Sequence, residues 1–579
     1  MLSFVVFDAE GVDARHFPPR HAYLIGPDET PVQGDIAFRI GVVDAAKAVH
    51  STVGLAVQIV VGPHPQNGTP GGAVAGGGGG SAIAGPRLTG LLTLQTCLLP
   101  DHVQPYLLTI ELARRQIMFV LNKMEDWGLF DLPAENPVIK QFEEARIAFT
   151  QALVGQRGTT EQGAESARGG FCARADRLAT QSVAAGIAAG EQLTLLNAER
   201  QFKFRMSGRG YKETALHLSR MTPEMPPPGA PIVIPGAGYC TLSEPPLIGC
   251  SISPNTSTEL QQKAAIATCD FVTMPMRWID LEPSEGKHNF GPTDRWIEWA
   301  IRTAKLPVVG GPLIDFRPLC APDWLFIWEN DYDTLEDLVG EHINAIVTRY
   351  RRTISRWTVA SGLHVNMNFK ISFDQIIELT KMCIQAVRKL HPAAKIQLEI
   401  SQPWGEYHAL NRRSIPPYVY AEAVVQAGAA NPAFHIDTLC IRTQMGHAEP
   451  GLATRDLMSL SAMLDRYATL EKPIAVSALG CPSSPIAPKP YRPRSGAEAT
   501  DPYEPGFWRE AWSEQQQATW LAAAAAIICS KPYIQSLCWQ DLSDPPNPAT
   551  SPEMPFGGLL GANGIAKPCL LYTSPSPRD

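Results

Sequence analysis

The segment CDFVTMPMRWIDLEPSEGKHNFGPTDRWIEWA, residues 269–300, contains a short apolar run, then a turn-rich stretch, then an amphipathic helical pattern. The same order of strand and helix recurs on both sides of this segment. A chain in which each strand is followed by a helix is typical of a parallel sheet covered by helices.

Eight strands of this kind are expected: PLIGCSIS (246–253), CDFVTMPMRW (269–278), LPVVGGPLIDF (306–316), ISRWTVASG (354–362), KIQLEISQPW (395–404), IDTLCIRTQM (436–445), KPIAVSALG (472–480) and SLCWQDL (536–542). Helical patterns lie between them, including residues 294–304, 335–353, 373–391, 453–470 and 514–530. This alternation predicts an α/β fold, a (β/α)8 TIM barrel over residues 241–568. The alternative is an open doubly wound sheet, but its typical Gly-rich first turn is absent.

The first 110 residues have a different pattern, in which short β-type runs alternate with turns. The runs AYLIG (22–26), IAFRIGVV (36–43), LAVQIVV (55–61) and GLLTLQTCLL (90–99) predict a small β-sandwich over residues 1–110. Helical spacing begins at Pro105 and returns over residues 174–203, which predicts a helical hairpin within residues 111–220. The Pro- and Gly-rich residues 221–240 are typical of an interdomain linker.

The final segment CLLYTSPSPRD, residues 569–579, resembles a translated sequencing-library adapter. We therefore treat it as a non-native tail and expect the native chain to continue past Pro568.

The composition excludes several classes of function. The 579 residues carry a net charge of −8, so the chain lacks the excess of Lys and Arg that nucleic-acid and anionic-membrane surfaces need. The 12 cysteines show neither C-x-x-C pairs nor metal-ligand spacing, which favours reduced and mostly buried thiols. The Gly-rich tract 68–85 lacks the Gly-Lys-Ser/Thr ending of a phosphate loop, and the histidines show no metal-ligand spacing, so we expect no cofactor and no metal. The amino terminus has no basic, signal-like start, so we expect a cytoplasmic protein.

Four segments of the predicted barrel resemble glycoside hydrolase family 10, the xylanases. They are residues 270–300, with a Leu-Glu-Pro block followed by a Gly and an Asn-Phe pair, and the segments VVGGPLIDF (308–316), RYRRTISRWTVASG (349–362) and GGLLGANGIAKP (557–568). The resemblance covers residues from about 245 to 568 and none of the first 230. It implies a barrel of this family and, by analogy with the modules that often accompany such barrels, a carbohydrate-binding role for the sandwich.

Retaining glycosidases need two carboxylates about 5 Å apart, one that protonates the leaving oxygen and one that attacks the anomeric carbon. The resemblance places the acid/base on Gly362, after Ser361, and the nucleophile on Ala478, after Ser477. Neither position carries a carboxylate. The inherited mechanism is therefore not expected to operate in its inherited form.

Other positions of the resemblance also differ from the family. The Glu-Asn pair that grips substrate falls on Thr273 and Met274, and the His and Trp of the third strand fall on Gly311 and Asp315. Polar and aromatic character is kept at three positions, where Arg277 replaces a Lys, Gln444 replaces a His and Trp539 matches a Trp. This combination favours a site remodelled for a different task.

The carboxyl ends of barrel strands form the functional mouth of such a fold, and the candidate residues lie there. The catalytic candidates are Glu406, Glu399, Asp541 and Asp315; the substrate-binding candidates are Arg277, Arg317, Gln402, Trp404, Gln444 and Trp539. The segment EISQPWGEYH (399–408) is the richest, because a Trp beside Gln and Glu suits the apolar face and the hydroxyls of a sugar ring. For residues 399–408, the alternative is a loop with one anchoring Trp and solvated carboxylates. For Asp315 and Arg317, the alternative is an internal salt bridge.

Three hypotheses of function follow from these residues. The leading one is a family-10-like barrel that binds a carbohydrate or another polyol without the usual catalytic pair. The second is an active glycoside hydrolase with relocated carboxylates, and the third is an interaction scaffold. We expect a carbohydrate or polyol ligand, no nucleic acid and no membrane as partners, and the sequence leaves the oligomeric state open.

Overall fold

The computed structural model describes residues 1–570 apart from residues 9, 18, 20, 63–88, 157–169, 208–231, 235–237, 241–244, 318, 410, 412, 450, 491–501 and 549–553. The Gly-rich tract 68–85 and the linker residues 221–231 therefore lie outside the described residues, as do residues 571–579 of the predicted non-native tail. Cys569 of that tail is buried, and its thiol donates to Oε1 of Gln517 at 3.3 Å. Within the predicted linker, β9 (Ile232–Ile234) and β10 (Gly238–Cys240) pair antiparallel.

The chain forms two compact units. The first comprises Met1–Leu193, Thr454–Met458 and Gly506–Ala511, and the second comprises Thr194–Ala453, Ser459–Pro505 and Trp512–Asp579. The first unit thus includes two short segments from late in the sequence, as well as the first third of the chain.

Two β-sheets form the amino-terminal part of the first unit. One has the order β4 (Gly34–Arg39), β5 (Val42–Lys47), β1 (Leu2–Val5) and β8 (Tyr106–Leu107). The other has the order β21 (Phe507–Trp508), β7 (Gly90–Gln95), β6 (Gly54–Val61), β2 (Tyr23–Ile25) and β3 (Pro31–Val32). The late segment Gly506–Ala511 therefore supplies an edge strand to this sheet.

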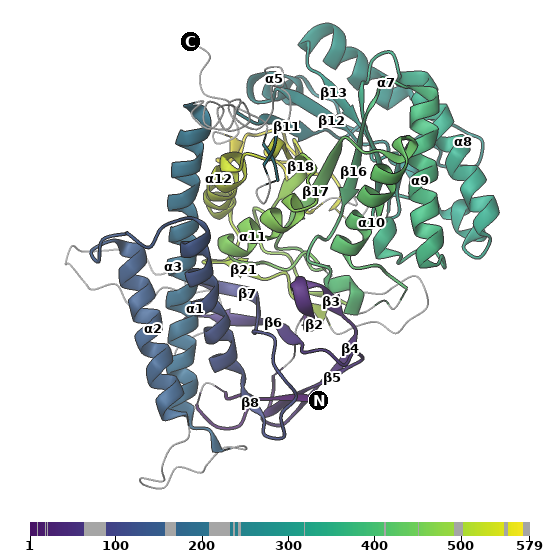
Figure 1. Ribbon diagram of the computed structural model, residues 1–579. Coiled ribbons are helices and arrows are strands. Elements are labelled where there is room, and N and C mark those ends of the chain that lie inside the picture. The colour runs from purple at the N-terminus through teal and green to yellow at the C-terminus, as the bar shows by residue number, and fades with distance from the viewer. Residues whose placement is uncertain are drawn as a thin grey trace, which may run out of the picture. The chain divides into compact units, whose positions relative to one another are not determined.

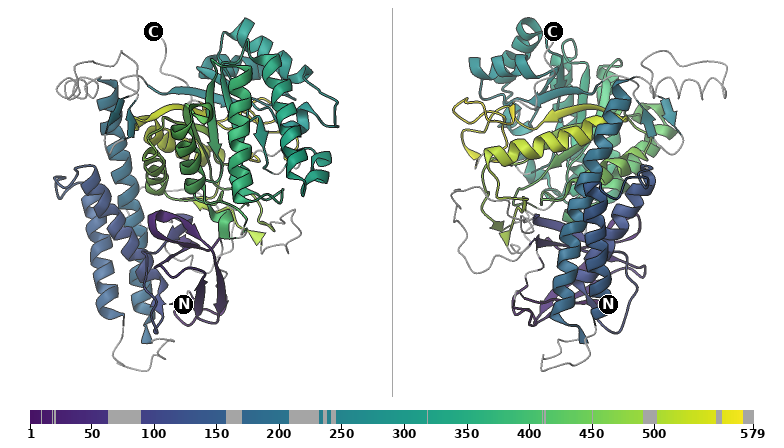
Figure 2. Two further views of the ribbon diagram at one scale, coloured as in Figure 1. Left: turned by 45° about the vertical axis from the view of Figure 1, so that its right-hand side comes forward. Right: turned by 90° about the vertical axis from the view of Figure 1, so that its left-hand side faces the viewer.

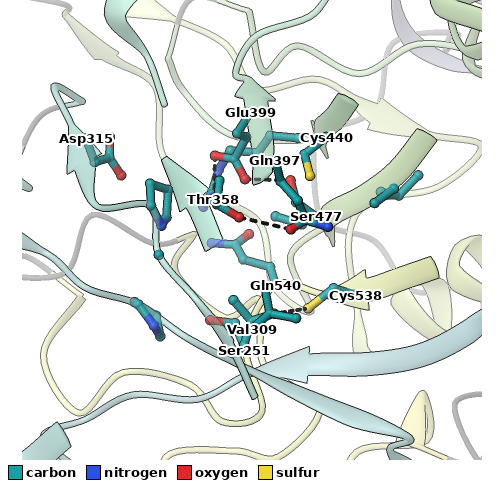
Figure 3. Close-up of a pocket in the computed structure, with 18 of the residues that line it drawn as sticks. Ser251, Val309, Asp315, Thr358, Gln397, Glu399, Cys440, Ser477, Cys538 and Gln540 are labelled. Carbon is teal, nitrogen blue, oxygen red and sulfur yellow. Dashed lines mark hydrogen bonds and ion pairs between the residues drawn. The ribbon is translucent and has the colours of Figure 1, made fainter. Parts of the chain in front are cut away.

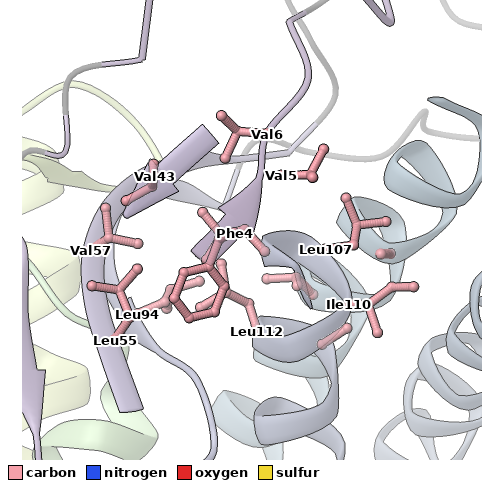
Figure 4. Close-up of a cluster of buried hydrophobic side chains, with 14 of the residues drawn as sticks. Phe4, Val5, Val6, Val43, Leu55, Val57, Leu94, Leu107, Ile110 and Leu112 are labelled. Carbon is pink, nitrogen blue, oxygen red and sulfur yellow. The ribbon is translucent and has the colours of Figure 1, made fainter. Parts of the chain in front are cut away.

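A single hydrophobic core joins these two sheets. Phe4 from the first sheet packs among Leu55, Leu94 and Leu112, as Figure 4 shows. Leu55 and Phe4 are completely buried. This arrangement of two sheets around a shared core matches the small β-sandwich predicted from the alternating runs.

Three helices complete the first unit: α1 (Leu108–Asp126), α2 (Pro137–Gly155) and α3 (Ala173–Met206), the last of which ends in the second unit. They lie side by side in Figures 1 and 2. The sequence predicted only a hairpin, so α2 is an addition to it. Its start is fixed locally, because the Asn136 side chain caps it by accepting from the amide of Val138 at 3.0 Å and Pro137 occupies the first turn.

The second unit contains a closed barrel of parallel strands. In chain order these are β11 (Leu247–Ser251), β12 (Phe271–Met274), β13 (Val308–Gly310) with β14 (Ile314–Asp315), β15 (Arg356–Ser361), β16 (Lys395–Ile400), β17 (Thr438–Gln444), β18 (Ile474–Gly480) and β22 (Ile534–Trp539). The strands β13 and β14 are two parts of the third barrel strand, because both pair with β15. β22 pairs with β11 and closes the barrel. The eight predicted strands and the (β/α)8 barrel are thus confirmed, and the open-sheet alternative is wrong.

Helices cover the outside of the barrel, as Figure 1 shows for α8, α9 and α10. The barrel helices are α5 (Glu259–Thr268), α6 (Trp278–Leu281), α7 (Gly291–Glu298), α8 (Tyr332–Tyr350), α9 (Phe373–Leu390), α10 (Pro417–Ala430), α11 (Leu457–Ala468) and α12 (Glu514–Ser530). A π-helical turn (Trp299–Ala304) continues α7, and short 3₁₀ turns include Leu363–Val365 and Glu406–Ala409. Capping boxes at Thr258 with Gln261 and at Ser372 with Gln375 begin α5 and α9.

Among the described helices, none has both the length and the hydropathy that crossing a lipid bilayer requires.

Candidate functional site in the barrel interior

The site begins with an unusual pattern inside the barrel strands. In β16, Gln397 and Glu399 alternate with Ile396, Leu398 and Ile400, and all five side chains are buried. Because side chains of a strand point alternately to its two faces, the polar pair faces one side and the aliphatic residues the other. Gln397 and Glu399 line the cavity at the centre of the barrel. The apolar residues of the strand therefore pack outward against the helices, while its polar residues fill the interior.

Polar side chains from other strands meet this pair. The residues that line the cavity include Ser251, Thr273, Thr358, Arg442, Ser477, Ser536 and Gln540, so that strands from the whole circumference contribute. TIM barrels usually fill this space with branched aliphatic side chains. Figure 3 shows Glu399, Gln397, Thr358 and Ser477 pointing toward one another in the cavity. A polar interior of this kind indicates a site rather than a packing core.

Glu399 is the centre of the hydrogen-bond network. Ser361 Oγ donates to Oε1 of Glu399 at 2.6 Å, and Ser477 Oγ donates to Oε2 at 2.5 Å. Arg442 Nη1 lies 3.6 Å from Oε1. The side chain of Glu399 is 3% exposed, so the arginine and the two hydroxyls compensate a charge that water reaches poorly.

Irregular strands place these groups. The pairing of β18 with β22 shifts in register between Val476 and Leu479, and that of β17 with β18 shifts between Ile441 and Arg442. Such irregularities turn side chains away from strict alternation. As a result four consecutive residues of β18, Ala475–Ala478, line the cavity.

A second carboxylate of the cavity has its own partner. Asp315, at the end of β14, accepts hydrogen bonds from Arg317 Nε at 3.0 Å and from Arg317 Nη2 at 2.6 Å. Asp315 is 4% exposed, and the Arg317 side chain is 13% exposed. The predicted internal salt bridge is therefore present, and both residues also line the cavity. Arg277 lines the cavity too, and it forms an ion pair with Asp280 at 2.6 Å.

The thiols of the cavity are protonated at neutral pH. Burial raises the pKa of Cys538 to about 12, against a smaller opposite effect of the hydrogen bond with Thr273. Burial and, to a smaller extent, the negative charge of Glu399 raise the pKa of Cys440 well above its ordinary value. Because the thiolate is the nucleophilic form, neither cysteine is suited to nucleophilic catalysis.

The cavity is small. Its volume is about 40 Å³, which is room for a few water molecules and far less than the roughly 300 Å³ of the smallest usual ligand pockets. The rim, where Arg277 and Arg317 follow their strands, is therefore the part that a larger ligand can meet.

The other predicted site residues do not line this cavity. Glu406 is buried and accepts from the amide of Gly451 at 2.8 Å. Trp539 is 2% exposed and donates from Nε1 to the carbonyl of Gly557 at 3.0 Å. Gln444 accepts from Arg442 Nε at 3.2 Å and also contacts Gln540, so it supports the network from the adjacent position.

Three predicted residues remain. Asp541 lines a separate small pocket together with Arg277. Gln402 has a left-handed backbone, with φ of 50°, and Trp404 is half-buried; neither lines the barrel cavity. The structure thus brings together Glu399, Asp315, Arg277 and Arg317, four of the predicted residues, and leaves the other six outside the cavity lining.

Sequence reasoning missed the partners of Glu399. Ser361 and Ser477 were considered only as residues next to absent glutamates, whereas both hold the central carboxylate. Gln397 and Thr358, which bond to each other at 3.2 Å, were not singled out. The polar residues at alternate positions of KIQLEI were the available signal.

The described residues contain no group of three or more His, Cys, Asp or Glu side chains that is arranged to hold a metal ion.

Part of the sequence is similar to a known protein family. Residues 243–373 match the model of glycosyl hydrolase family 10, a range that runs from the first barrel strand to the start of α9. Endo-1,4-beta-xylanase 3 of Hypocrea jecorina is 27% identical over 127 residues, which are 21% of this chain and 35% of that protein. Endo-1,4-beta-xylanase B of Thermotoga neapolitana is 26% identical over 86 residues, which are 15% of this chain and 24% of that protein. The chain thus matches about a third or less of the length of these relatives.

Matches to solved structures cover a larger part of the chain. The native xylanase 10B from Thermotoga maritima is 15% identical, with a TM-score of 0.41, and the match covers 57% of this chain and 93% of that one. Xylanase 10B from Thermotoga petrophila RKU-1, solved in complex with xylobiose, is 15% identical, with a TM-score of 0.41 and coverage of 56% and 92%. The second unit of this chain is therefore a (β/α)8 barrel similar to those of glycosyl hydrolase family 10.

Proposed function

We propose that this chain is a family-10-like protein whose barrel binds a carbohydrate or another polyol and has lost or altered the two-carboxylate hydrolysis of its relatives. The observation that carries the proposal is the engagement of Glu399 by Ser361 and Ser477. These serines come from the fourth and seventh barrel strands, and the sequence resemblance assigns the acid/base and the nucleophile to the residues that follow them.

The chemistry of the two cavity carboxylates supports this proposal. In retaining hydrolysis one carboxyl must deliver a proton and the other must attack carbon, so both need access to substrate. Here Glu399 accepts from two hydroxyls and lies near Arg442, and Asp315 is held by the fork of Arg317. Groups in such networks are poorly placed to attack or to protonate a ligand.

The backbone at Gly362 argues in the same direction. Gly362 has φ of +69°, and a Cβ there would lie 3.0 Å from Cγ of Arg317. A glutamate at this position would be strained and would collide with the salt-bridged arginine. The local structure around the assigned acid/base position is therefore built for a glycine.

The ligand is expected at the rim, because the cavity has room only for water. The side chains of Arg277 and Arg317 are each 13% exposed, and each forms an ion pair with a carboxylate. Oriented planar donors of this kind suit the paired hydroxyls of a sugar or polyol. Relatives solved with xylobiose and xylopentaose suggest xylo-oligosaccharides as the first ligands to test.

A second function has one specific observation in its favour. Glu399 and Asp315 line the same cavity, so an active glycoside hydrolase with relocated carboxylates would use these two. The interaction-scaffold hypothesis has no comparable observation in the barrel.

The test combines turnover with binding. Release of reducing ends from xylans, glucans and mannans is measured for the wild type, Glu399→Gln and Glu406→Gln, and thermal stabilisation by the matching oligosaccharides is measured in parallel. Glu406→Gln is the matched control, because Glu406 is a buried barrel carboxylate outside the cavity lining.

The proposal predicts no turnover by any of the three proteins and stabilisation of the wild type by at least one oligosaccharide. Arg277→Gln should weaken that binding about 10-fold or more, because it removes a charged donor. Turnover that Glu399→Gln loses and Glu406→Gln keeps would instead establish the relocated-carboxylate enzyme. The absence of both turnover and binding would leave the scaffold hypothesis.

A further inference from the structure

Two cysteines, one on the first barrel strand and one after the helix that follows it, have no part in the proposed function. Cys250 lies in β11, and Cys269 follows the last residue of α5, so the two residues bracket the first helix of the barrel. Their sulfur atoms lie 3.2 Å apart. Cys250 is completely buried and Cys269 is 5% exposed. No described residue is assigned to a disulfide, and both cysteines are free thiols.

The separation of the sulfurs suits a covalent bond. A disulfide requires about 2.05 Å between sulfurs, so closure of this pair needs a movement of about 1.2 Å. The two side chains come from a strand and from the end of the helix packed on it, and their sulfurs already point at each other. Cys383, by contrast, is completely buried within α9.

We propose that Cys250 and Cys269 form a reversible disulfide that staples the end of α5 to the first barrel strand. The bond closes a loop that contains the whole of α5, and it lies next to Ser251, which lines the central cavity. Cys250 faces the helix layer because neighbouring side chains of a strand point to opposite faces. Oxidation therefore makes the strand that contributes Ser251 to the cavity more rigid, while the disulfide itself lies outside the cavity.

The chemistry balances as a thiol–disulfide exchange with a small-molecule disulfide. The Cys269 thiolate attacks one sulfur of that disulfide, forms a mixed disulfide and releases one small thiolate. The Cys250 thiolate then attacks the Cys269 sulfur and releases the second small thiolate. Two protein thiols are oxidised, one small disulfide is reduced to two thiols, and the two protons pass to the released thiolates.

The environment of the pair supports this order of attack. The hydrogen bond between the two sulfurs lowers the pKa of Cys269, while the same interaction and burial raise the pKa of Cys250 well above its ordinary value. The more exposed sulfur is thus also the better thiolate.

The experiment treats the whole chain with oxidised glutathione, both in the folded state and during refolding, then denatures and alkylates it and maps the peptides without reduction. The expected result is a linked Cys250–Cys269 peptide and two fewer alkylated thiols than the 12 of the reduced chain. The linked peptide should persist in Cys383→Ala and disappear in Cys269→Ser. The oxidised wild type should also melt about 3–6 °C higher than the reduced form.

The proposal is overturned if neither treatment of the wild type yields the linked peptide, or if Cys250 is recovered joined to a different cysteine. Because this readout needs only the wild type, a folding defect of Cys269→Ser does not affect the decision. Binding at the barrel rim is measured separately, so failure of the disulfide and failure of the proposed function remain distinguishable.

Discussion

Ser361 and Ser477 donate to the two different oxygens of the same carboxylate, that of Glu399, at 2.6 and 2.5 Å. They come from the fourth and seventh barrel strands, and Glu399 comes from the fifth. A single acidic group therefore ties three strands together where the related family is expected to use two glutamates. This arrangement stabilises the interior of the barrel.

Removal of the central carboxylate should destabilise the barrel. Glu399→Ala removes the acceptor of the buried Ser361 hydroxyl and the half-buried Ser477 hydroxyl, and it removes the carboxylate 3.6 Å from Arg442. We therefore expect a loss of about 3 kcal/mol in the free energy of unfolding. Glu399→Gln keeps one acceptor oxygen and should cost about half as much. Urea denaturation of both variants checks this order, and equal losses would contradict the role of the serine hydrogen bonds.

The backbone at Gly362 can be tested against a glycine of matching conformation. Gly362→Ala should destabilise by about 1–2 kcal/mol, because it combines a left-handed backbone with a contact 3.0 Å from Arg317. Gly286 has φ of +72° and no atom within 4 Å of an added Cβ, so Gly286→Ala reports the backbone strain alone. The free energy of unfolding of both variants is measured by chemical denaturation. The difference between the two losses gives the contribution of the contact with Arg317. If Gly286→Ala is as costly as Gly362→Ala, that contact contributes nothing.

The stability of the barrel should fall in acid because of His364. Burial lowers the pKa of His364 from 6.5 to about 4, and its Nε2 contacts the carbonyl of Ser401 at 2.8 Å. Since the folded pKa lies below the unfolded one, the stabilising contribution is complete above pH 6.5 and is lost as the pH falls toward 4. The full loss is about 3 kcal/mol.

His364→Phe keeps an aromatic ring against Tyr420, whose centroid lies 4.9 Å from that of His364. The variant should be less stable at pH 7, because the hydrogen bond to Ser401 is lost, but its stability should depend less on pH between 6.5 and 4. Urea denaturation at a series of pH values measures both curves. Parallel curves would show that His364 does not titrate as described.

In the first unit, Glu191 should control the local stability of the β21 edge. Its carboxylate accepts from Trp508 Nε1 at 2.6 Å and from Arg509 Nη2 at 2.8 Å. Glu191→Ala removes a buried carboxylate that accepts from both Trp508 and Arg509, so we expect a loss of about 2–4 kcal/mol. Hydrogen exchange of β7, which pairs with β21, should accelerate.

The control for this variant is Glu143→Ala. Glu143 is a helix carboxylate of the same unit, 44% exposed and paired with Arg146. Surface pairs of this kind contribute well under 1 kcal/mol, so exchange in β7 should remain unchanged. Equal acceleration in both variants would contradict a specific role for Glu191.

The sequence by itself determined the class of the barrel. Apolar runs at strand spacing predict the strands, and caps such as Ser372 with Gln375 mark where the helices between them begin. Both signals are local, because they do not depend on which residues pack together in the folded chain. The additional helix α2 was missed, although Asn136 and Pro137 are the cap and first-turn residues that mark its start. Glu399 and the salt bridge between Asp315 and Arg317 could also be predicted from the sequence. Glu399 lies near the end of a predicted strand, and Asp315 and Arg317 are only two positions apart.

The tertiary structure alone decided which residues share the site. Ser361, Glu399 and Ser477 are far apart in the sequence, and only closure of the barrel brings their strands around one axis. Where the pairing of β18 is irregular, Val476 and Ala478 also line the cavity beside Ala475 and Ser477, a departure that no periodicity reports. The same closure buries Glu406 and Trp539 in other contacts and keeps them out of the cavity lining. Residue types and local spacing specify the elements, whereas convergence of side chains depends on register and closure, which are properties of the whole sheet.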